Sequence, residues 1–377
     1  MKVLVAGDYC QRYRVDNAIR DGRYSELFSE IKPFVESADY SILNVEFPIV
    51  LTKDDAKPIP KCGPHLQGTI ECIDAIKYAG FSCCTLANNH ILDQGGKCCN
   101  DTKIELEKAG LDTVGAGKNL NEACKTLYKI VGDEKLAIIN CCENEFTIAT
   151  EEIPGANPLN IIQQFYKIQE AKKQADYVLV IVHGGPEFHQ LPTPRMQEAY
   201  RFFIDAGADS VVNHHQHCYS GYEKYKGKYI FYGLGNLCFD NPNERNGTWN
   251  EGYMVELEFN LNSAQKVKIF PYVQCGEIVG IHMMKNINQF QSRLCQLNDI
   301  IASKQDLKEA TNQYYDRCAI SYYAFHNYEN KYLNKLWRMG LIPSLRSLKR
   351  MFSIWNLIEC ESHRDKTYYA FNKYLKR

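Results

Sequence analysis

The chain has 377 residues, of which 44 are Lys or Arg, 45 are Asp or Glu and 45% are apolar. This composition is typical of globular proteins and excludes disordered, collagen-like and multi-spanning membrane classes. The formal net charge of −1 hides a division, because residues 331–377 hold 11 basic and 3 acidic residues, a net of +8, against a net of −9 for the residues before them.

The sixteen cysteines form no pattern that indicates disulfides or a zinc ribbon. Adjacent pairs such as Cys83-Cys84 rarely suit a disulfide ladder, and no CxxC spacing occurs. An acid at Asp8 interrupts the apolar start, and no later uncharged run has the length of a membrane span. We therefore expect a cytoplasmic protein with reduced thiols, in peripheral contact with the inner face of the membrane at most.

Short apolar runs alternate with amphipathic stretches over the first 275 residues. The runs predict strands at residues 2–6, 40–45, 82–86, 136–141, 177–183, 210–212 and 229–232. The amphipathic stretches predict helices at residues 24–37, 70–79, 101–109, 159–173 and 195–206. This alternation is typical of an α/β core, and Gly80, Gly110 and Gly207 predict left-handed caps at three helix ends.

Two adjacent extended segments, residues 253–259 and 267–271, are expected to close a sheet in antiparallel fashion. After about residue 280 the pattern becomes helical, with helices expected at residues 294–308 and 309–323. We therefore divide the chain into an α/β domain of residues 1–280 and a helical C-terminal extension of residues 281–377.

The tail of this extension is a basic amphipathic segment, residues 336–355, which Pro343 interrupts. Two interpretations stay open. The segment either packs on the α/β domain with its charges solvated, or docks on an anionic membrane surface or an acidic partner. No nucleic-acid partner is expected, because the basic surplus is confined to this tail.

Side chains that can ligate metals follow the predicted strands one after another, at the ends where α/β folds place ligands. We expect them to hold two divalent cations about 3.5–4 Å apart, with one bridging carboxylate and positions left for water and substrate. Nitrogen and oxygen ligands without thiolate fit Mn, Fe or Zn. Two such ions outweigh two carboxylates, so the site would attract a phosphate or a carboxylate. The candidate ligands are Asp8, Glu46, Asn89, His183, His215 and His217.

Each of these residues has a structural alternative when taken alone. A single histidine at a strand end is most often a satisfied core or surface residue, and Asp8 could cap the next helix. We also expect His215 and His217 to lie in an extended segment, where side chains two residues apart point the same way. The other histidines are expected to be structural, with His189 and His214 as candidates for supporting the ligands. They are His65, His189, His214, His282, His326 and His363.

Several sequence blocks occur in a characteristic order over about residues 1–275. They are Gly7-Asp8, Asn44-Val45-Glu46-Phe47-Pro48, LANNHILDQG at residues 86–95, HGGPEF at residues 183–188, HQH at residues 215–217 and GLGNLCFD at residues 233–240. In this order the blocks resemble the CapA family of capsule and poly-γ-glutamate synthesis proteins. The Ala-Asn-Asn-His and Leu-Gly-Asn blocks make the resemblance specific.

The resemblance implies the fold of the calcineurin-like metallophosphoesterases, an α/β four-layer sandwich of two mixed β-sheets flanked by helices. It also implies a dinuclear metal centre with the six candidate ligands above. By the same resemblance, His90 takes the place of the histidine that protonates the leaving group, and Asp93 and Glu187 are nearby acids that support these groups.

The function implied is metal-dependent hydrolysis of a phosphoester, amide or related bond by a metal-activated water. The substrate would be an anionic small molecule or polymer, and the partner the capsule-synthesis machinery. An alternative is a non-catalytic subunit or polymer-handling module of a capsule assembly system. This alternative is kept because Cys10 stands where true phosphoesterases carry the histidine of their Asp-x-His motif.

Overall fold

The computed structural model describes residues 1–61, 63–260, 265–325, 330–345 and 347–359. His326, His363 and Arg346 of the basic segment lie outside these residues, as do residues 360–377. The chain forms two compact units, Met1–Lys308 and Glu309–Arg377. The division at residue 280 that the sequence pattern suggests stays a prediction.

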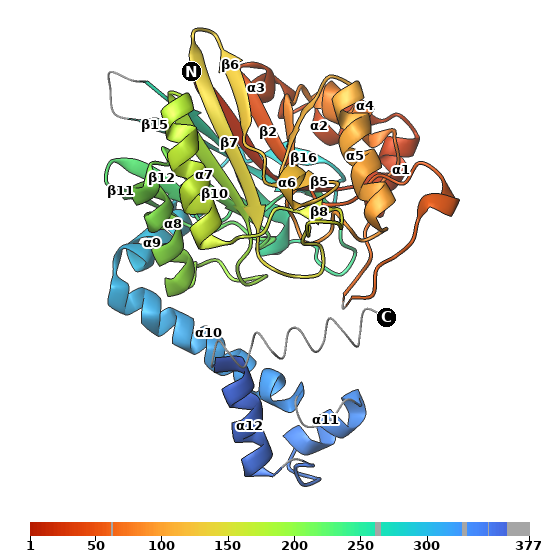
Figure 1. The fold of residues 1–377 in the computed structure, drawn as a ribbon, viewed down its shortest axis with the longest axis vertical. Helices are drawn as coiled ribbons and strands as arrows, with labels where there is room; N and C mark the ends of the chain where they lie inside the picture. The colour runs from red at the N-terminus through yellow and green to blue at the C-terminus, as the bar shows by residue number, and fades with distance from the viewer. Residues whose placement is uncertain (62, 261–264, 326–329, 346, 360–377) are drawn as a thin grey trace. The chain divides into compact units, whose positions relative to one another are not determined.

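Two mixed β-sheets form the centre of the first unit (Figure 1). The larger sheet has the order β16-β15-β14-β1-β2-β3-β4, with β13 also paired to β1, and the smaller has the order β11-β12-β10-β9-β7-β6. The strands of the larger sheet are β1 (Lys2–Cys10), β2 (Tyr40–Val45), β3 (Cys83–Thr85), β4 (Asp112–Val114), β13 (Asn236–Phe239), β14 (Glu251–Glu258), β15 (Lys266–Gln274) and β16 (Ile281–Met283). Those of the smaller are β6 (Leu127–Val131), β7 (Glu134–Cys142), β9 (Tyr177–His183), β10 (Ser210–His214), β11 (Tyr222–Tyr225) and β12 (Lys228–Phe231). A short pair, β5 (Ala116–Gly117) and β8 (Gly155–Ala156), stands apart.

The central strands of both sheets are parallel, so their carboxyl ends lie at the same edge. In the larger sheet β1, β2, β3 and β4 run parallel, and in the smaller β7, β9, β10 and β12 do so. Every residue of β2 and β9 is buried, which explains their continuous apolar runs. The antiparallel closure expected near residues 253–271 is the β14–β15 pair.

Helices cover the outer faces of the two sheets and complete a four-layer α/β sandwich, as the resemblance implies (Figure 1). The larger sheet shares its core with the helices that follow its strands, and α7 and α8 pack on the smaller sheet. The helices on the larger sheet are α1 (Arg14–Arg20), α2 (Tyr24–Phe28), α3 (Lys32–Glu36), α4 (Cys72–Ala79) and α5 (Gly96–Lys108). The others of this region are α6 (Leu120–Ala123), α7 (Ile161–Gln174) and α8 (Pro194–Ala206), with single turns η1 (Lys53–Asp55) and η2 (Thr248–Asn250).

One predicted helix is wrong in its continuity. Residues 24–37 form two short helices, α2 and α3, because Pro33 lies in the first turn of α3 and cannot continue a preceding helix. The predicted glycine caps are present, with φ values of 91° at Gly80, 86° at Gly110 and 122° at Gly207. Gly7 has a different role, since a Cβ there would lie 2.0 Å from the carbonyl oxygen of Gly235.

The rest of the described chain is mainly helical, with α9 (Asn288–Ala302), α10 (Lys304–Phe325), α11 (Lys331–Arg338) and α12 (Leu348–Glu359). The Asn330 side chain caps α11 by accepting hydrogen bonds from the backbone N–H groups of Tyr332 and Leu333. Pro343 lies between α11 and α12, where the sequence pattern predicts an interruption. Over the described residues no helix has both the length and the apolar character needed to cross a bilayer.

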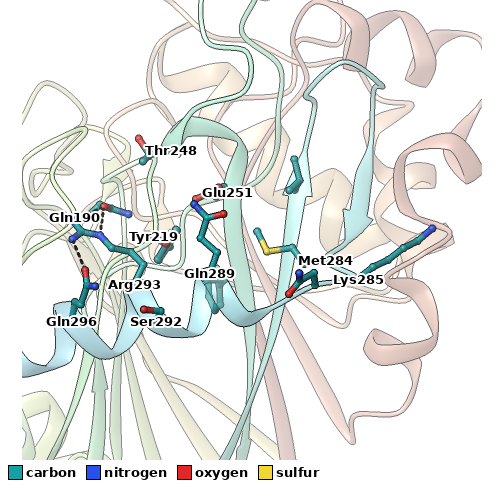
Figure 2. Close-up of a pocket in the computed structure, with 13 residues that line it drawn as sticks. Gln190, Tyr219, Thr248, Glu251, Met284, Lys285, Gln289, Ser292, Arg293 and Gln296 are labelled. Carbon is teal, nitrogen blue, oxygen red and sulfur yellow. Dashed lines mark hydrogen bonds between the residues drawn. The ribbon is translucent and has the colours of Figure 1, made fainter.

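Helix α9 borders a pocket of about 620 Å³ on the first unit, which the start of β14 and the loop carrying Gln190 also line (Figure 2).

Candidate metal centre

The strand ends bring the six candidate ligands together in one buried group, which we call the strand-end cluster. Its members are Asp8 on β1, Glu46 directly after β2, Asn89 after β3, His183 at the end of β9, and His215 and His217 after β10. All six are buried. The parallel pairing explains the convergence, because Asp8 is in register with Asn44 on β2 and His183 with His214 on β10.

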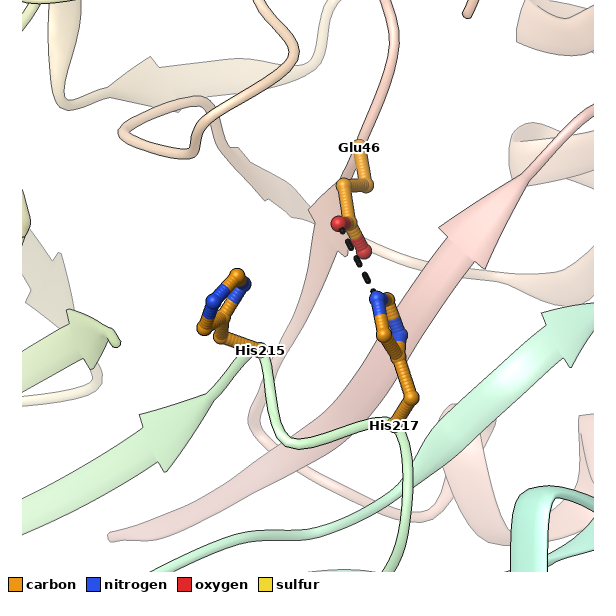
Figure 3. Close-up of side chains that lie close together, drawn as sticks. All are labelled: Glu46, His215 and His217. Atoms are coloured by element: carbon orange, nitrogen blue, oxygen red, sulfur yellow. Dashed lines mark ion pairs between the residues drawn. The ribbon is translucent and has the colours of Figure 1, made fainter. Parts of the chain in front are cut away.

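Glu46 belongs to both groups of potential ligands in the strand-end cluster, and Figure 3 shows it beside His215 and His217. Its Oε1 is 3.6 Å from His183 Nε2 and 3.7 Å from His217 Nε2. Neither carboxylate oxygen has a hydrogen-bond partner, although the side chain is fully buried. Burial, and next the charge of Asp8, raise the pKa of Glu46 well above its usual value. Burial of a carboxylate without hydrogen-bond donors lowers the stability of the fold, and a bound cation would offset that loss.

Asp8 holds the loop that carries the two final histidines. It accepts a hydrogen bond from the Asn44 side-chain amide at 2.7 Å and one from the backbone N–H of His215 at 3.1 Å. Burial raises the pKa of Asp8, although His217 and these hydrogen bonds oppose the rise. His214, considered above as a supporting residue, lies with its Nδ1 3.4 Å from Asp8 Oδ1.

The predicted extended conformation of the His-x-His segment is wrong. Strand β10 ends at His214, and His215 and His217 have φ values of 89° and 54°, in the left-handed region. The two rings reach the same cluster, with centroids 6.0 Å apart, because the loop turns and not because of strand periodicity. Residues other than glycine rarely adopt this conformation, which costs on the order of 1–3 kcal/mol and concentrates at functional sites.

The imidazole rings of His183 and His215 face each other within the cluster. His183 Nε2 is 3.1 Å from His215 Nδ1 and 3.0 Å from Asn89 Oδ1. Burial, reinforced by the neighbouring histidines, lowers the pKa of His183 well below its usual value, and burial lowers that of His215 to about 3. Both rings are therefore neutral at physiological pH, the state that metals bind.

His217 is oriented by a partner that keeps its other nitrogen free. Its Nδ1 lies 2.9 Å from Asn236 Oδ1, and Asn236 donates in turn to the backbone carbonyls of His217 and Trp249. The hydrogen bond at Nδ1 leaves Nε2 directed at Glu46. The Trp249 ring packs on the imidazole with 4.8 Å between centroids, and Phe188 stacks on Trp249 at 5.7 Å.

A second group, which we call the His90 network, consists of His90, Asp93 and Lys61. His90 Nδ1 lies 2.6 Å from Asp93 Oδ2, and its Nε2 lies 4.0 Å from Glu46 Oε1. Asp93 also pairs with Lys61 and accepts a hydrogen bond from the backbone N–H of Leu66 at 2.7 Å. Burial lowers the pKa of His90, although Asp93 opposes the change. The ring is therefore neutral and presents Nε2 to the strand-end cluster.

Glu187 does not join either group by a direct contact. It is exposed in the loop after β9, and within the described parts of the chain its side chain has no hydrogen bond or ion pair. Its charge nevertheless contributes to the raised pKa of Glu46. Its predicted supporting role stays a prediction.

Four residues at the site are missing from the sequence-based prediction. Asn44 and Asn236 lie inside blocks that carry the resemblance. Their positions were therefore marked, but nothing in the sequence indicated what their side chains contact. Lys61 lies in the long loop between β2 and α4, where no periodicity marks it. Glu145 follows β7, and its Oε1 is 3.7 Å from His215 Nε2; inspection of the residues after that strand could have found it.

The donor set fits divalent metal ions. In each of two groups of three residues, the potential ligand atoms lie within 4.8 Å of one another. One group is Glu46, His215 and His217, and the other is Asp8, Glu46 and His183. Glu46 belongs to both, as a bridging carboxylate would. Its unpartnered oxygens and the neutral rings of His183 and His215 are what a metal centre requires.

Comparison with known proteins identifies a family. The model for the bacterial capsule synthesis protein PGA_cap matches residues 2–241. The capsule biosynthesis protein CapA of Bacillus anthracis is 34% identical over 248 residues, which cover 64% of this chain and 60% of the relative. The PGA biosynthesis protein CapA of Bacillus subtilis strain 168 is 31% identical over 268 residues, which cover 70% and 69%. The chain thus spans 60% to 69% of the length of these two relatives, and its predicted resemblance to the CapA family is confirmed.

Solved structures similar to this chain include a novel phosphatase from Mycoplasma pneumoniae and a 5'-nucleotidase precursor from Thermus thermophilus. The first has a TM-score of 0.43 and 15% identity, covering 72% of this chain and 93% of that structure. The second has a TM-score of 0.42 and 13% identity, covering 85% and 59%.

Proposed function

Because the chain belongs to the PGA_cap family of bacterial capsule synthesis proteins, we propose that it is a metal-dependent hydrolase that acts in the metabolism of a capsule or another anionic surface polymer, alongside the capsule-synthesis machinery. The observation that carries this proposal is Glu46, a fully buried carboxylate between two groups of potential ligands, with no hydrogen bond to either oxygen.

The strand-end cluster would hold the ions. Glu46 would bridge two of them, with Asp8, His183 and Asn89 on one side and His215 and His217 on the other. When bound, Mn, Fe or Zn ions supply Lewis-acid chemistry and lower the pKa of a water. Because His183 and His215 are neutral and the cluster has two carboxylates, two divalent ions would leave the site with a positive charge, which favours an anionic substrate.

His90 would move a proton at its Nε2. Asp93 accepts a hydrogen bond from Nδ1–H, which favours the tautomer with the proton on Nδ1 and leaves the Nε2 lone pair facing the cluster. Lys61 pairs with Asp93 and the Leu66 backbone N–H donates a hydrogen bond to it, so the carboxylate stays in place and the ring keeps this orientation. His90 would therefore accept a proton at Nε2 and return it to the leaving group.

Hydrolysis tests this proposal. The full chain, purified without chelator and loaded with Mn, is assayed against a panel of phosphoesters and amides at neutral pH. We expect turnover that falls about 10²–10⁴-fold in His90→Ala while metal content stays at the wild-type level. An exposed histidine in the loop before α4, His65, gives the matched control His65→Ala, which should keep full turnover.

A non-catalytic role in polymer handling is the second candidate, and Cys10 favours it. The Cys10 side chain is buried next to the strand-end cluster, and burial, reinforced by Glu46, raises its pKa well above the usual value. A neutral thiol is a poor ligand compared with an imidazole. Full metal loading without turnover of any panel compound would favour this candidate.

We also propose that the basic tail contacts an anionic membrane surface. In α11 the apolar side chains Leu333 and Leu336 are exposed, and Lys331, Lys335 and Arg338 are exposed as well. No acidic residue occurs between residues 330 and 358. We expect the full chain to float with vesicles of anionic phospholipid but not with neutral ones. Equal recovery with both would contradict this contact.

A further inference from the structure

The pocket beside α9 is built separately from the metal centre, from residues that no step above uses. Helix α9 contributes Gln289 and Arg293, the start of β14 contributes Glu251, and Tyr219 and Gln190 come from loops (Figure 2). Its volume of about 620 Å³ lies in the range of small-molecule sites.

Arg293 supplies a cation that no acid neutralises. Its guanidinium donates to Gln190 Oε1 at 3.2 and 3.0 Å and to Gln296 Oε1 at 3.4 Å. Among the residues that the structure describes, no carboxylate lies within ion-pair distance of it. The two amide oxygens orient the guanidinium and leave its charge available to an anion.

Glu251 supplies the opposite charge in the same pocket. The residue is half-buried, and burial raises the pKa of its carboxyl. Its backbone is fixed by the pairing of β14 with β15, where it is in register with Val273. Nowhere in the described part of the chain does its side chain meet a hydrogen-bond donor or a cation, so Glu251 and Arg293 do not pair with each other.

Lys285 also lines the pocket, but its side chain extends away from Glu251 and Arg293 (Figure 2). Glu251 and Arg293 carry opposite charges and share the pocket without pairing, so they select a ligand with the complementary pair of charges. An anion alone would meet the carboxylate of Glu251, and a cation alone would meet the guanidinium of Arg293. A ligand with both charges satisfies both side chains. The Tyr219 ring, which packs on Phe290 at 4.8 Å, adds an apolar wall for the rest of such a ligand.

We propose that this pocket binds a zwitterionic amino acid or dipeptide, with its carboxylate on Arg293 and its ammonium group on Glu251. Two lining residues are close in the chain to the rings that pack beside His217, since Gln190 lies two residues after Phe188 and Thr248 directly precedes Trp249. Binding does not depend on the metal, so this proposal and the proposed hydrolase activity fail independently.

Calorimetry of the full chain with L-alanyl-L-alanine, its N-acetyl form and its C-terminal amide tests the proposal, once with chelator and once with Mn. We expect the free dipeptide to bind about tenfold more tightly than either blocked form, since each lost charged contact is worth about 1.4 kcal/mol or more. Glu251→Gln should weaken the free dipeptide about tenfold and leave the N-acetyl form unchanged. Arg293→Gln should weaken both of these and leave the amide unchanged.

Arg23→Gln, which changes a partly exposed arginine directly before α2, is the control and should bind like wild type. Thermal unfolding of each variant checks that it is folded. Three results would each overturn the proposal: no binding of the free dipeptide, equal binding of free and blocked forms, or an equal loss for all three compounds in Glu251→Gln.

Discussion

The His90 network and the strand-end cluster lie next to each other, but they compensate buried charge in different ways. Both oxygens of Asp93 have donors, from Lys61, His90 and the Leu66 backbone N–H. Both oxygens of Glu46, equally buried, have none. The difference shows that this fold can satisfy a buried carboxylate with its own groups. Where it does not, the partner is to be sought outside the chain, and a metal ion suits the surrounding neutral histidines.

The largest loss of stability is expected when Asp93, which compensates the buried charge of Lys61, is removed. Asp93→Ala leaves the buried Lys61 ammonium without a carboxylate, so the free energy of unfolding should fall by about 3–5 kcal/mol. Urea denaturation of the chelated protein measures it. Asp101→Ala, which breaks the more exposed pair with Lys97 on α5, is the control and should stay near wild type. A loss in Asp93→Ala no greater than in the control would remove the contrast between the two groups.

Binding of a metal ion to the strand-end cluster should stabilise the folded protein. At a free Mn concentration about a hundredfold above the dissociation constant, the free energy of unfolding should rise by about 2.7 kcal/mol. Thermal unfolding with increasing Mn measures the change. The same titration of His215→Ala/His217→Ala should show no shift, and a full shift in that variant would place the ion elsewhere.

Glu46→Gln should stabilise the chelated protein relative to chelated wild type and should abolish the stabilisation by Mn. In chelator, removal of a buried carboxyl group whose oxygens have no donors should raise the free energy of unfolding by about 1–3 kcal/mol. Addition of Mn should not raise the free energy of unfolding of the variant further, because the bridging ligand is lost. If the chelated variant is less stable than chelated wild type, then Glu46 has compensation within the protein and the comparison with Asp93 fails.

The smallest effect is expected at Asn236, which orients a ligand without contacting the ion. Asn236→Ala should weaken Mn binding by at least about tenfold, as is usual for partners that orient metal ligands. Competition with a fluorescent chelator measures the affinity. Asn121→Ala, an asparagine on α6 away from the site, should bind Mn like wild type. Unchanged affinity in Asn236→Ala would mean that Trp249 and the loop suffice to fix His217.

The convergence of the ligands could be predicted from the sequence, because side chains that follow successive parallel strands of an α/β fold lie at the same edge of the sheet. The sequence therefore identified Asp8, Glu46 and the histidines that the structure brings together. It failed at the conformation of the His215–His217 loop, since positive φ values at histidines carry no local sequence signal. It also failed at Lys61, whose contact with Asp93 depends on how a long loop folds back. The break between α2 and α3 was readable from Pro33 but was outweighed by the amphipathic pattern.

The metal content of the full chain, purified without chelator and measured by elemental analysis, is the sharpest test of a dinuclear strand-end cluster. We expect about two transition-metal ions per chain, their loss in His215→Ala/His217→Ala, and their retention in the control His65→Ala. Equal metal content in the double variant and in wild type would contradict it.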